Sequence, residues 1–175
     1  TGKLVVPNNT TPGTYTITYK ICDKLDANVC DTATAKIKVP SVIDAVDDPE
    51  VSIPRTGGTV SILTNDTLNG NPATTSNVTI TVTNDGGLTG LTVDGTGKLV
   101  VPNNTTPGTY TITYKICDKL DANVCDTATA KIKVPSVIDA VDDPEVSIPR
   151  TGGTVSILTN DTLNGNPATT SNVTI

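Results

Sequence analysis

Apolar and polar residues alternate along several short stretches of this chain, which is the pattern of half-buried β-strands. The clearest case is residues 109–117, where Tyr110, Ile112, Tyr114 and Ile116 would face one side of a sheet and Thr and Lys the other. Segments rich in Gly, Pro and Asn separate such stretches, and these residues favour turns. The pattern therefore predicts an all-β protein built from short strands.

The chain also repeats itself. Residues 1–80 recur letter for letter as residues 96–175, and only residues 81–95 occur once, so the period is 95 residues. A unit of this length has the size of one small all-β domain and is too long for a helical solenoid repeat. We therefore expect tandem domains.

Within one period, alternation and turn signals predict seven strands, which would make an immunoglobulin-like (Ig-like) β-sandwich. The strands are expected at about residues 45–53, 59–63, 77–83, 88–93, 98–102, 109–117 and 127–134. Residues 64–76 are expected to form a long loop between the second and third strands.

This phase predicts one complete Ig-like repeat at residues 41–135. Residues 1–40 would then be the C-terminal half of one repeat, and residues 136–175 the N-terminal half of the next. Both end pieces are expected to expose sheet edges and half a core unless they pair with each other or with another chain. The alternative phase, in which 81–95 is a linker, is disfavoured because that segment itself looks like strands.

Each copy holds two cysteines, which flank the loop between its last two strands. A disulfide can close the end of such a hairpin and would contribute roughly 2–3 kcal/mol. The pairs would be Cys22 with Cys30 and Cys117 with Cys125. Reduced thiols are the alternative, and zinc is disfavoured because only two thiolates and no His are present. Disulfides would place the chain in an oxidising, exported setting.

Most acids of the complete repeat map to the end of the sandwich that faces the preceding repeat. They are Asp44, Asp47, Asp48, Asp66, Asp94, Asp118, Asp121 and Asp126. A hard divalent cation with oxygen ligands would offset their repulsion, and calcium tolerates irregular geometry. The predicted ligands of a structural calcium ion are Asp44, Asp47, Asp48 and Asp66, with Asp118 behind them, and Asp139, Asp142, Asp143 and Asp161 in the next copy. The alternative is a solvated rim of turn and capping residues.

Several function classes are disfavoured by composition. The net charge is −6 and no basic cluster exists, so nucleic acid and anionic membranes are poor partners. No apolar run approaches 18 residues, so membrane insertion of this segment is not expected. The chain has no His, no nucleophile motif and no phosphate-binding glycine loop, and we expect no enzyme activity.

A family resemblance covers the whole period. Its motifs are A-x-D-D at residues 45–48, N-D-T at 65–67, D-G-T-G-K-L at 94–99, P-G-T-Y-T-I-T-Y at 107–114 and T-A-x-x-x-V at 129–134. Together they resemble the bacterial cadherin-like, tandem-95 family of Ig-fold repeats in large surface adhesins. Residues 114–130 are similar to SprB-type repeats of the gliding-motility adhesins of Bacteroidota. The resemblance implies an extracellular, bacterial cell-surface location, and related repeats often bind calcium.

Four threonines lie in frames that resemble the D-[S/T]-[A/L] acceptor of Bacteroidota O-glycosylation: Thr67, Thr162, Thr32 and Thr127. The first pair is expected to be better placed than the second. Because the chain is rich in Thr, chance matches are the alternative.

These features favour a structural spacer or stalk repeat of a long secreted cell-surface adhesin, with gliding motility as the finer assignment. Its partners would be neighbouring repeats of the same chain and a surface or glycan ligand at a distant tip. The alternatives are a glycan- or host-ligand-binding module and a subunit of a self-assembling surface filament. The lack of Trp and Phe disfavours glycan-binding loops, which usually stack sugars on exposed aromatic rings.

Overall fold

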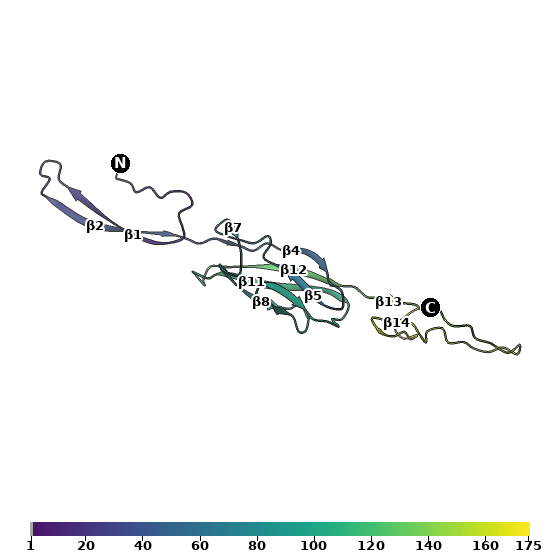
Figure 1. The fold of residues 1–175 in the computed structure, drawn as a ribbon. Helices are drawn as coiled ribbons and strands as arrows, with labels where there is room; N and C mark the ends of the chain where they lie inside the picture. The colour runs from purple at the N-terminus through teal and green to yellow at the C-terminus, as the bar shows by residue number, and fades with distance from the viewer. Residues whose placement is uncertain (1) are drawn as a thin grey trace.

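The computed structural model describes residues 2–175, and every regular element in that range is a β-strand (Figure 1). The strands are β1 (Gly13–Cys22), β2 (Cys30–Val39), β3 (Ile43–Asp44), β4 (Asp48–Ser52), β5 (Gly58–Ser61), β6 (Thr67–Leu68), β7 (Asn71–Pro72), β8 (Val78–Asn84), β9 (Thr92–Val93), β10 (Lys98–Val101), β11 (Gly108–Asp118), β12 (Cys125–Val134), β13 (Ile138–Asp139), β14 (Thr162–Leu163) and β15 (Asn166–Pro167). Residues 2–175 include no helical segment that could span a membrane.

Two sheets form a sandwich in the middle of the chain. One has four strands in the order β4-β12-β11-β8, and the other has three in the order β5-β10-β9. The hairpin of β11 and β12 is antiparallel throughout, from Gly108 opposite Val134 to Cys117 opposite Cys125. Strand β4 joins β12 in parallel. These two sheets confirm the predicted all-β sandwich.

The core lies between the sheets and follows the predicted alternation. Ile112, Tyr114 and Ile116 of β11 are fully buried, and Leu99 of β10 meets them from the other sheet together with Ile62. Burial of these side chains drives folding, because each contributes roughly 1.5–3 kcal/mol relative to its exposed state.

The strands of the two sheets fall on the seven predicted ranges, but the sequence analysis missed three short strands. β6 and β7 lie inside the segment expected to be a loop, and β3 precedes the first predicted strand. The turn between β6 and β7 consists of Asn69 and Gly70, with φ of 54° and 74°. An Asn-Gly pair with two positive φ values is the typical two-residue hairpin turn, so this dipeptide was an available signal.

The two end pieces have the same sequence as parts of the sandwich but a different environment. β1 and β2 form an isolated two-stranded sheet. Ile17 on β1 is 37% exposed, whereas its counterpart Ile112 is completely buried. At the other end, β13, β14 and β15 reproduce β3, β6 and β7, but residues 140–161 contain no strand. Their counterparts, residues 45–66, contain β4 and β5, which pair with β12 and β10.

The duplication supplies an internal control for core packing. Leu99→Ala should lower the free energy of unfolding of the sandwich by about 3 kcal/mol, because it leaves a cavity between the sheets. The identical change at Leu4, which is 53% exposed, should have an effect below about 1 kcal/mol. Urea unfolding of dilute protein measures both. Equal losses at the two positions would contradict the described difference in burial.

Candidate functional site

A buried tyrosine hydroxyl organises the acidic end of the sandwich. Tyr114 is fully buried and donates to the carbonyl oxygen of Ile62 at 2.8 Å. The Asp66 carboxylate lies against the same hydroxyl, with Oδ2 at 3.2 Å, and its Oδ1 accepts from the backbone N–H of Val46 at 2.8 Å. A hydroxyl has one proton, so this cluster contains more acceptors than donors.

Asp48 adds another carboxyl group to this cluster. Its side chain is 9% exposed, and its Oδ2 is buried with no hydrogen-bond partner. Burial raises the pKa of Asp48 to about 6, the nearby Tyr114 hydroxyl opposes this shift, and the neighbouring charges of Asp66 and Asp47 add to it. Burial also raises the pKa of Asp66, against the hydrogen bonds from Val46 and Tyr114. A proton or a cation would relieve the shortage of donors.

Other acids of this end accept hydrogen bonds from backbone N–H groups. Asp47 Oδ1 accepts from Thr129 N at 2.7 Å, and this contact lowers the pKa of Asp47. Asp126 Oδ2 accepts from Ala45 N at 2.9 Å. In the first bond the donor lies on β12, and in the second the acceptor lies on β12. These carboxylates therefore hold the segment that leads into β4 to strand β12.

Asp94 has a purely local role. Its Oδ1 accepts from the backbone N–H groups of Thr96 and Lys98 at 2.8 and 3.0 Å, within the turn between β9 and β10. These bonds lower the pKa of Asp94. Asp94 is thus a turn residue, as the alternative interpretation of the acids expects.

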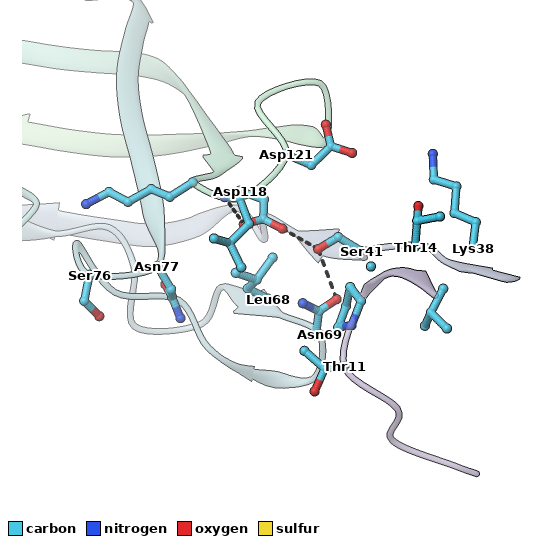
Figure 2. A pocket seen from close by; sticks show the side chains of 15 residues that line it. Thr11, Thr14, Lys38, Ser41, Leu68, Asn69, Ser76, Asn77, Asp118 and Asp121 are labelled. Atoms are coloured by element: carbon cyan, nitrogen blue, oxygen red, sulfur yellow. Dashed lines mark hydrogen bonds between the residues drawn. The ribbon is translucent and has the colours of Figure 1, made fainter. Parts of the chain in front are cut away.

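Asp118 belongs to a second cluster, at the junction with the preceding repeat (Figure 2). Its Oδ2 accepts from Ser41 Oγ at 2.6 Å, and its Oδ1 accepts from Leu120 N at 2.8 Å. Asn69 Oδ1 accepts from Ser41 Oγ at 3.2 Å and from Val42 N at 2.8 Å. The connection between β2 and β3 is therefore fixed to the sandwich rather than free.

The same docking recurs at the second junction. Val137 N donates to Asn164 Oδ1 at 2.8 Å, and Asn164 N donates to the Val137 carbonyl at 2.7 Å. These contacts reproduce those of Val42 and Asn69, so the linker adopts one conformation in both copies.

A direct hydrogen bond joins the sandwich to the following repeat. Arg55 Nη1 donates to the carbonyl oxygen of Asn164, a residue 109 positions further along the chain. Arg55 is also bonded within its own repeat. Its Nε donates to the Thr105 carbonyl at 3.3 Å, and its carbonyl oxygen accepts from Asn104 N at 2.7 Å. Arg55 therefore acts as a clamp between consecutive repeats, a role that the sequence analysis did not predict.

The predicted metal ligands thus fall into two groups. Asp48 and Asp66 come together around Tyr114, with the charges of Asp44 and Asp47 close enough to act on them, whereas Asp118 lies in the junction cluster. Within residues 2–175 no set of three or more His, Cys, Asp or Glu side chains is arranged to hold a metal ion. The pair Asp48 and Asp66 fits a cation best, because a buried carboxylate oxygen there has no partner.

The corresponding acids of the last copy lack the tyrosine. Asp161 Oδ1 accepts from Val141 N at 2.8 Å, just as Asp66 accepts from Val46. Asp139, Asp142 and Asp143 are exposed. The loop therefore folds locally, and the buried acidic cluster requires β11.

Both predicted disulfides are present. Cys22 is bonded to Cys30 and Cys117 to Cys125, and the described residues contain no free cysteine. In each hairpin the two cysteines are directly opposite residues at the end of the paired strands. The bond therefore closes the loop of residues 118–124, which also contributes Asp118 and Asp121 to the junction.

The four candidate glycosylation sites differ in exposure. Thr32 and Thr127 are exposed on β2 and β12, whereas Thr67 and Thr162 are half-buried on β6 and β14. Accessibility thus favours the pair that the sequence analysis ranked second.

Comparisons with known proteins give no family assignment. No family model matches the chain, and no curated protein matches it. Solved structures similar to it include the extracellular cadherin domains 1–4 of protocadherin gamma B7, with 15% identity over 75% of this chain and a TM-score of 0.38. The extracellular domain of protocadherin gamma B4 matches with 17% identity over 71% of this chain and a TM-score of 0.39. The matched parts are 36% and 20% of those chains.

The buried acidic cluster predicts that the sandwich loses stability as the pH rises. Because the folded-state pKa of Asp48 is about 6 against 3.8 for an ordinary Asp, the stabilising proton is fully present below pH 3.8 and is lost as the pH rises through 6. The free energy of unfolding should fall by on the order of 2 kcal/mol between pH 4 and pH 7. Urea unfolding at a series of pH values measures this.

Asp48→Asn should remove most of this pH dependence and raise stability at pH 7. Asp143→Asn is the matched control, because it changes the same residue in the same local sequence at an exposed position. A flat pH profile for the unchanged protein would contradict the prediction.

Proposed function

We propose that this chain is a structural spacer, in which Ig-like repeats stacked end to end hold a distant binding region away from its anchor. The observation that carries this proposal is the junction. Arg55 bonds one repeat to the next, and the linker residues Val42 and Val137 are each held to the first hairpin turn of the repeat that they begin. The elongated course of the chain in Figure 1 fits such a role.

The disulfides support an extracellular location for the spacer, because such bonds persist in oxidising compartments. We propose an adhesion protein of the bacterial surface as its setting. The motifs at residues 45–48, 65–67 and 94–99 support this through the resemblance to tandem-95 repeats, and the segment 114–130 supports the finer assignment to a gliding-motility adhesin. Neighbouring repeats would be the immediate partners and a surface or glycan ligand the distal one. The proposal gives the chain no catalytic role.

Calcium is proposed as a structural ion of the acidic end. Asp48 and Asp66 would hold it, and Asp44 and Asp47 would lie at its edge. Calcium would supply positive charge to a cluster that has too few donors, and it prefers carboxylate and carbonyl oxygens. Since Asp47 and Asp126 already tie β4 to β12 at this end, an ion here would stiffen the part of the sandwich next to the junction.

The spacer proposal predicts that length grows linearly with the number of repeats. Inserting one further 95-residue period should raise the maximum dimension by about 35–40 Å, because strands of about eleven residues rise ~3.3 Å per residue. Small-angle scattering, extrapolated to zero concentration, measures this. An unchanged maximum dimension would contradict a rod.

Arg55→Ala should make the rod more flexible and shorten its average extension without unfolding the sandwich. Arg150→Ala is the matched control, since Arg150 has no following repeat in the described structure. If both variants scattered alike, Arg55 would not be the clamp.

Thermal unfolding tests calcium binding separately from the spacer function. Calcium at pH 7 should raise the melting temperature of the protein by several degrees, and Asp48→Asn should abolish the shift while Asp143→Asn preserves it. A melting temperature that responds to neither calcium nor chelator would remove calcium and leave the spacer proposal intact.

A further inference from the structure

The two sheets of the complete sandwich end in four edge strands, which are β4 and β8 in one sheet and β5 and β9 in the other. Edge strands are commonly protected from pairing by short length, by Pro or by charge. β4 carries Asp48, Pro49 and Glu50, β5 has four residues, and β9 has two. β8 has seven residues, Val78–Asn84, and its sequence contains no charged residue, no Pro and no Gly. β8 is therefore a long edge without this protection.

Every second residue of β8 turns its backbone groups away from β11. Asn77 accepts from Lys119 N at 3.0 Å, so it belongs to the set of residues that bond to the β11 side. Hydrogen-bonded positions alternate along an antiparallel strand, and Thr79 continues this set. Ile80 and Val82 belong to the other set. Their N–H and C=O groups therefore point to the free edge.

The side chains of β8 divide between the two faces of the sheet. Thr79 and Thr81 are exposed on the outer face, whereas Ile80 and Val82 are half-buried and pack against the core. The ladder with β11 is regular from Val78 to Val82, and its register shifts only after Val82. The free edge thus offers a regular strand with one polar and one apolar face.

We propose that β8 of one copy of this chain pairs with β8 of a second copy, antiparallel and about a two-fold axis at Ile80. The contact is strand addition between two identical edges, and it joins the two four-stranded sheets into one continuous sheet. It would hold two molecules side by side, running in opposite directions. This interaction goes beyond the spacer function and does not depend on it.

A two-fold axis at Ile80 makes the facing residues compatible. Ile80 would face Ile80 of the second copy in a hydrogen-bonded pair, and Val82 would face Val78, so the half-buried apolar side chains gain cover. On the outer face Thr79 would face Thr81 in a non-hydrogen-bonded pair. Side chains approach most closely in such pairs, and Thr–Thr contacts across strands are favourable.

Charges beside the strand favour the antiparallel arrangement. Lys119 lies at the N-terminal end of β8, where its ammonium group donates to the Thr75 carbonyl. Asp85 directly follows the C-terminal end of β8 and is exposed. Antiparallel pairing brings Asp85 of each copy towards Lys119 of the other, whereas parallel pairing would bring like charges together.

The charge of the whole chain indicates why a second copy would meet at this edge. The net charge is −6, so two copies repel each other over most of their surfaces. β8 is neutral, and Lys115 lies beside it on β11, opposite Thr81. Two acidic molecules can therefore approach along β8. Because the regular ladder is short, we expect a weak contact that depends on concentration.

Charge design across the two-fold axis tests the pairing and its register. T79E/T81E places carboxylates opposite each other in both Thr pairs and should be monomeric. T79K/T81E places opposite charges in the same pairs and should associate at least as strongly as the unchanged protein. Sedimentation velocity of the full chain up to about 1 mM measures association, and the unchanged protein should form dimers in this range.

Thr111→Glu is the matched control and should leave association unchanged. Thr111 is an exposed threonine on β11, which is not an edge strand, and like Thr81 it lies opposite a lysine. The melting temperatures of all variants should stay close to that of the unchanged protein, because the substituted side chains lie outside the core.

Hydrogen exchange of the Ile80 and Val82 amides reports on this edge alone. In the unchanged protein both amides should exchange about twofold or more slowly at 1 mM than at 10 μM, and in T79E/T81E their rates should not depend on concentration. Three results would overturn the pairing: exchange of these amides in the unchanged protein that ignores concentration, protection that persists in T79E/T81E, or a T79K/T81E variant that stays monomeric.

Discussion

Pairing between strands from the two ends of the period is the interaction on which the rest of this structure depends. Residues 48–52 and 58–61 are strands because β12 and β10 lie beside them. The same sequence forms no strand in residues 140–161, where those partners are missing. Local propensity therefore does not decide the state of these segments, and the backbone ladder and the apolar core form together or not at all. The local hairpin of β6 and β7 is different, because β14 and β15 reproduce it without the sandwich.

The buried acidic cluster is a consequence of the same pairing. Tyr114 reaches Ile62 and Asp66 only when β11 packs against the other sheet. The burial of Asp48 and Asp66 then removes stability that a fully apolar core would keep, since a buried oxygen without a partner costs on the order of 1–3 kcal/mol. A cluster of buried carboxylates is least favourable when charged, so its stability should depend on pH, and a bound cation would act in the same direction as a proton. The end of the sandwich next to the junction is thus its most condition-dependent part.

How much the sequence could predict depended on the length of each signal. The alternation at 109–117 and the 95-residue shift are long patterns, and they led to the all-β sandwich and to the position of its core. The cysteine spacing was enough to anticipate both disulfides. The strands β6 and β7 have two residues each, too few for a period, and only Asn69-Gly70 marked them. Assigning each acidic residue to a loop placed most of them at one end of the sandwich. This assignment could not show that Asp47, Asp94 and Asp126 accept hydrogen bonds from backbone N–H groups.

The clamp at Arg55 could not be read from one repeat, because its acceptor is a backbone carbonyl in the next. Asn164 offers that carbonyl because its φ of 55° turns the chain at the tip of a hairpin, and the same side chain holds Val137 of the linker. One asparagine thus fixes both the linker and the arginine, so the position of the sandwich relative to the next repeat is set by contacts with the turn between β14 and β15. A rod built in this way carries its own geometry from one junction to the next.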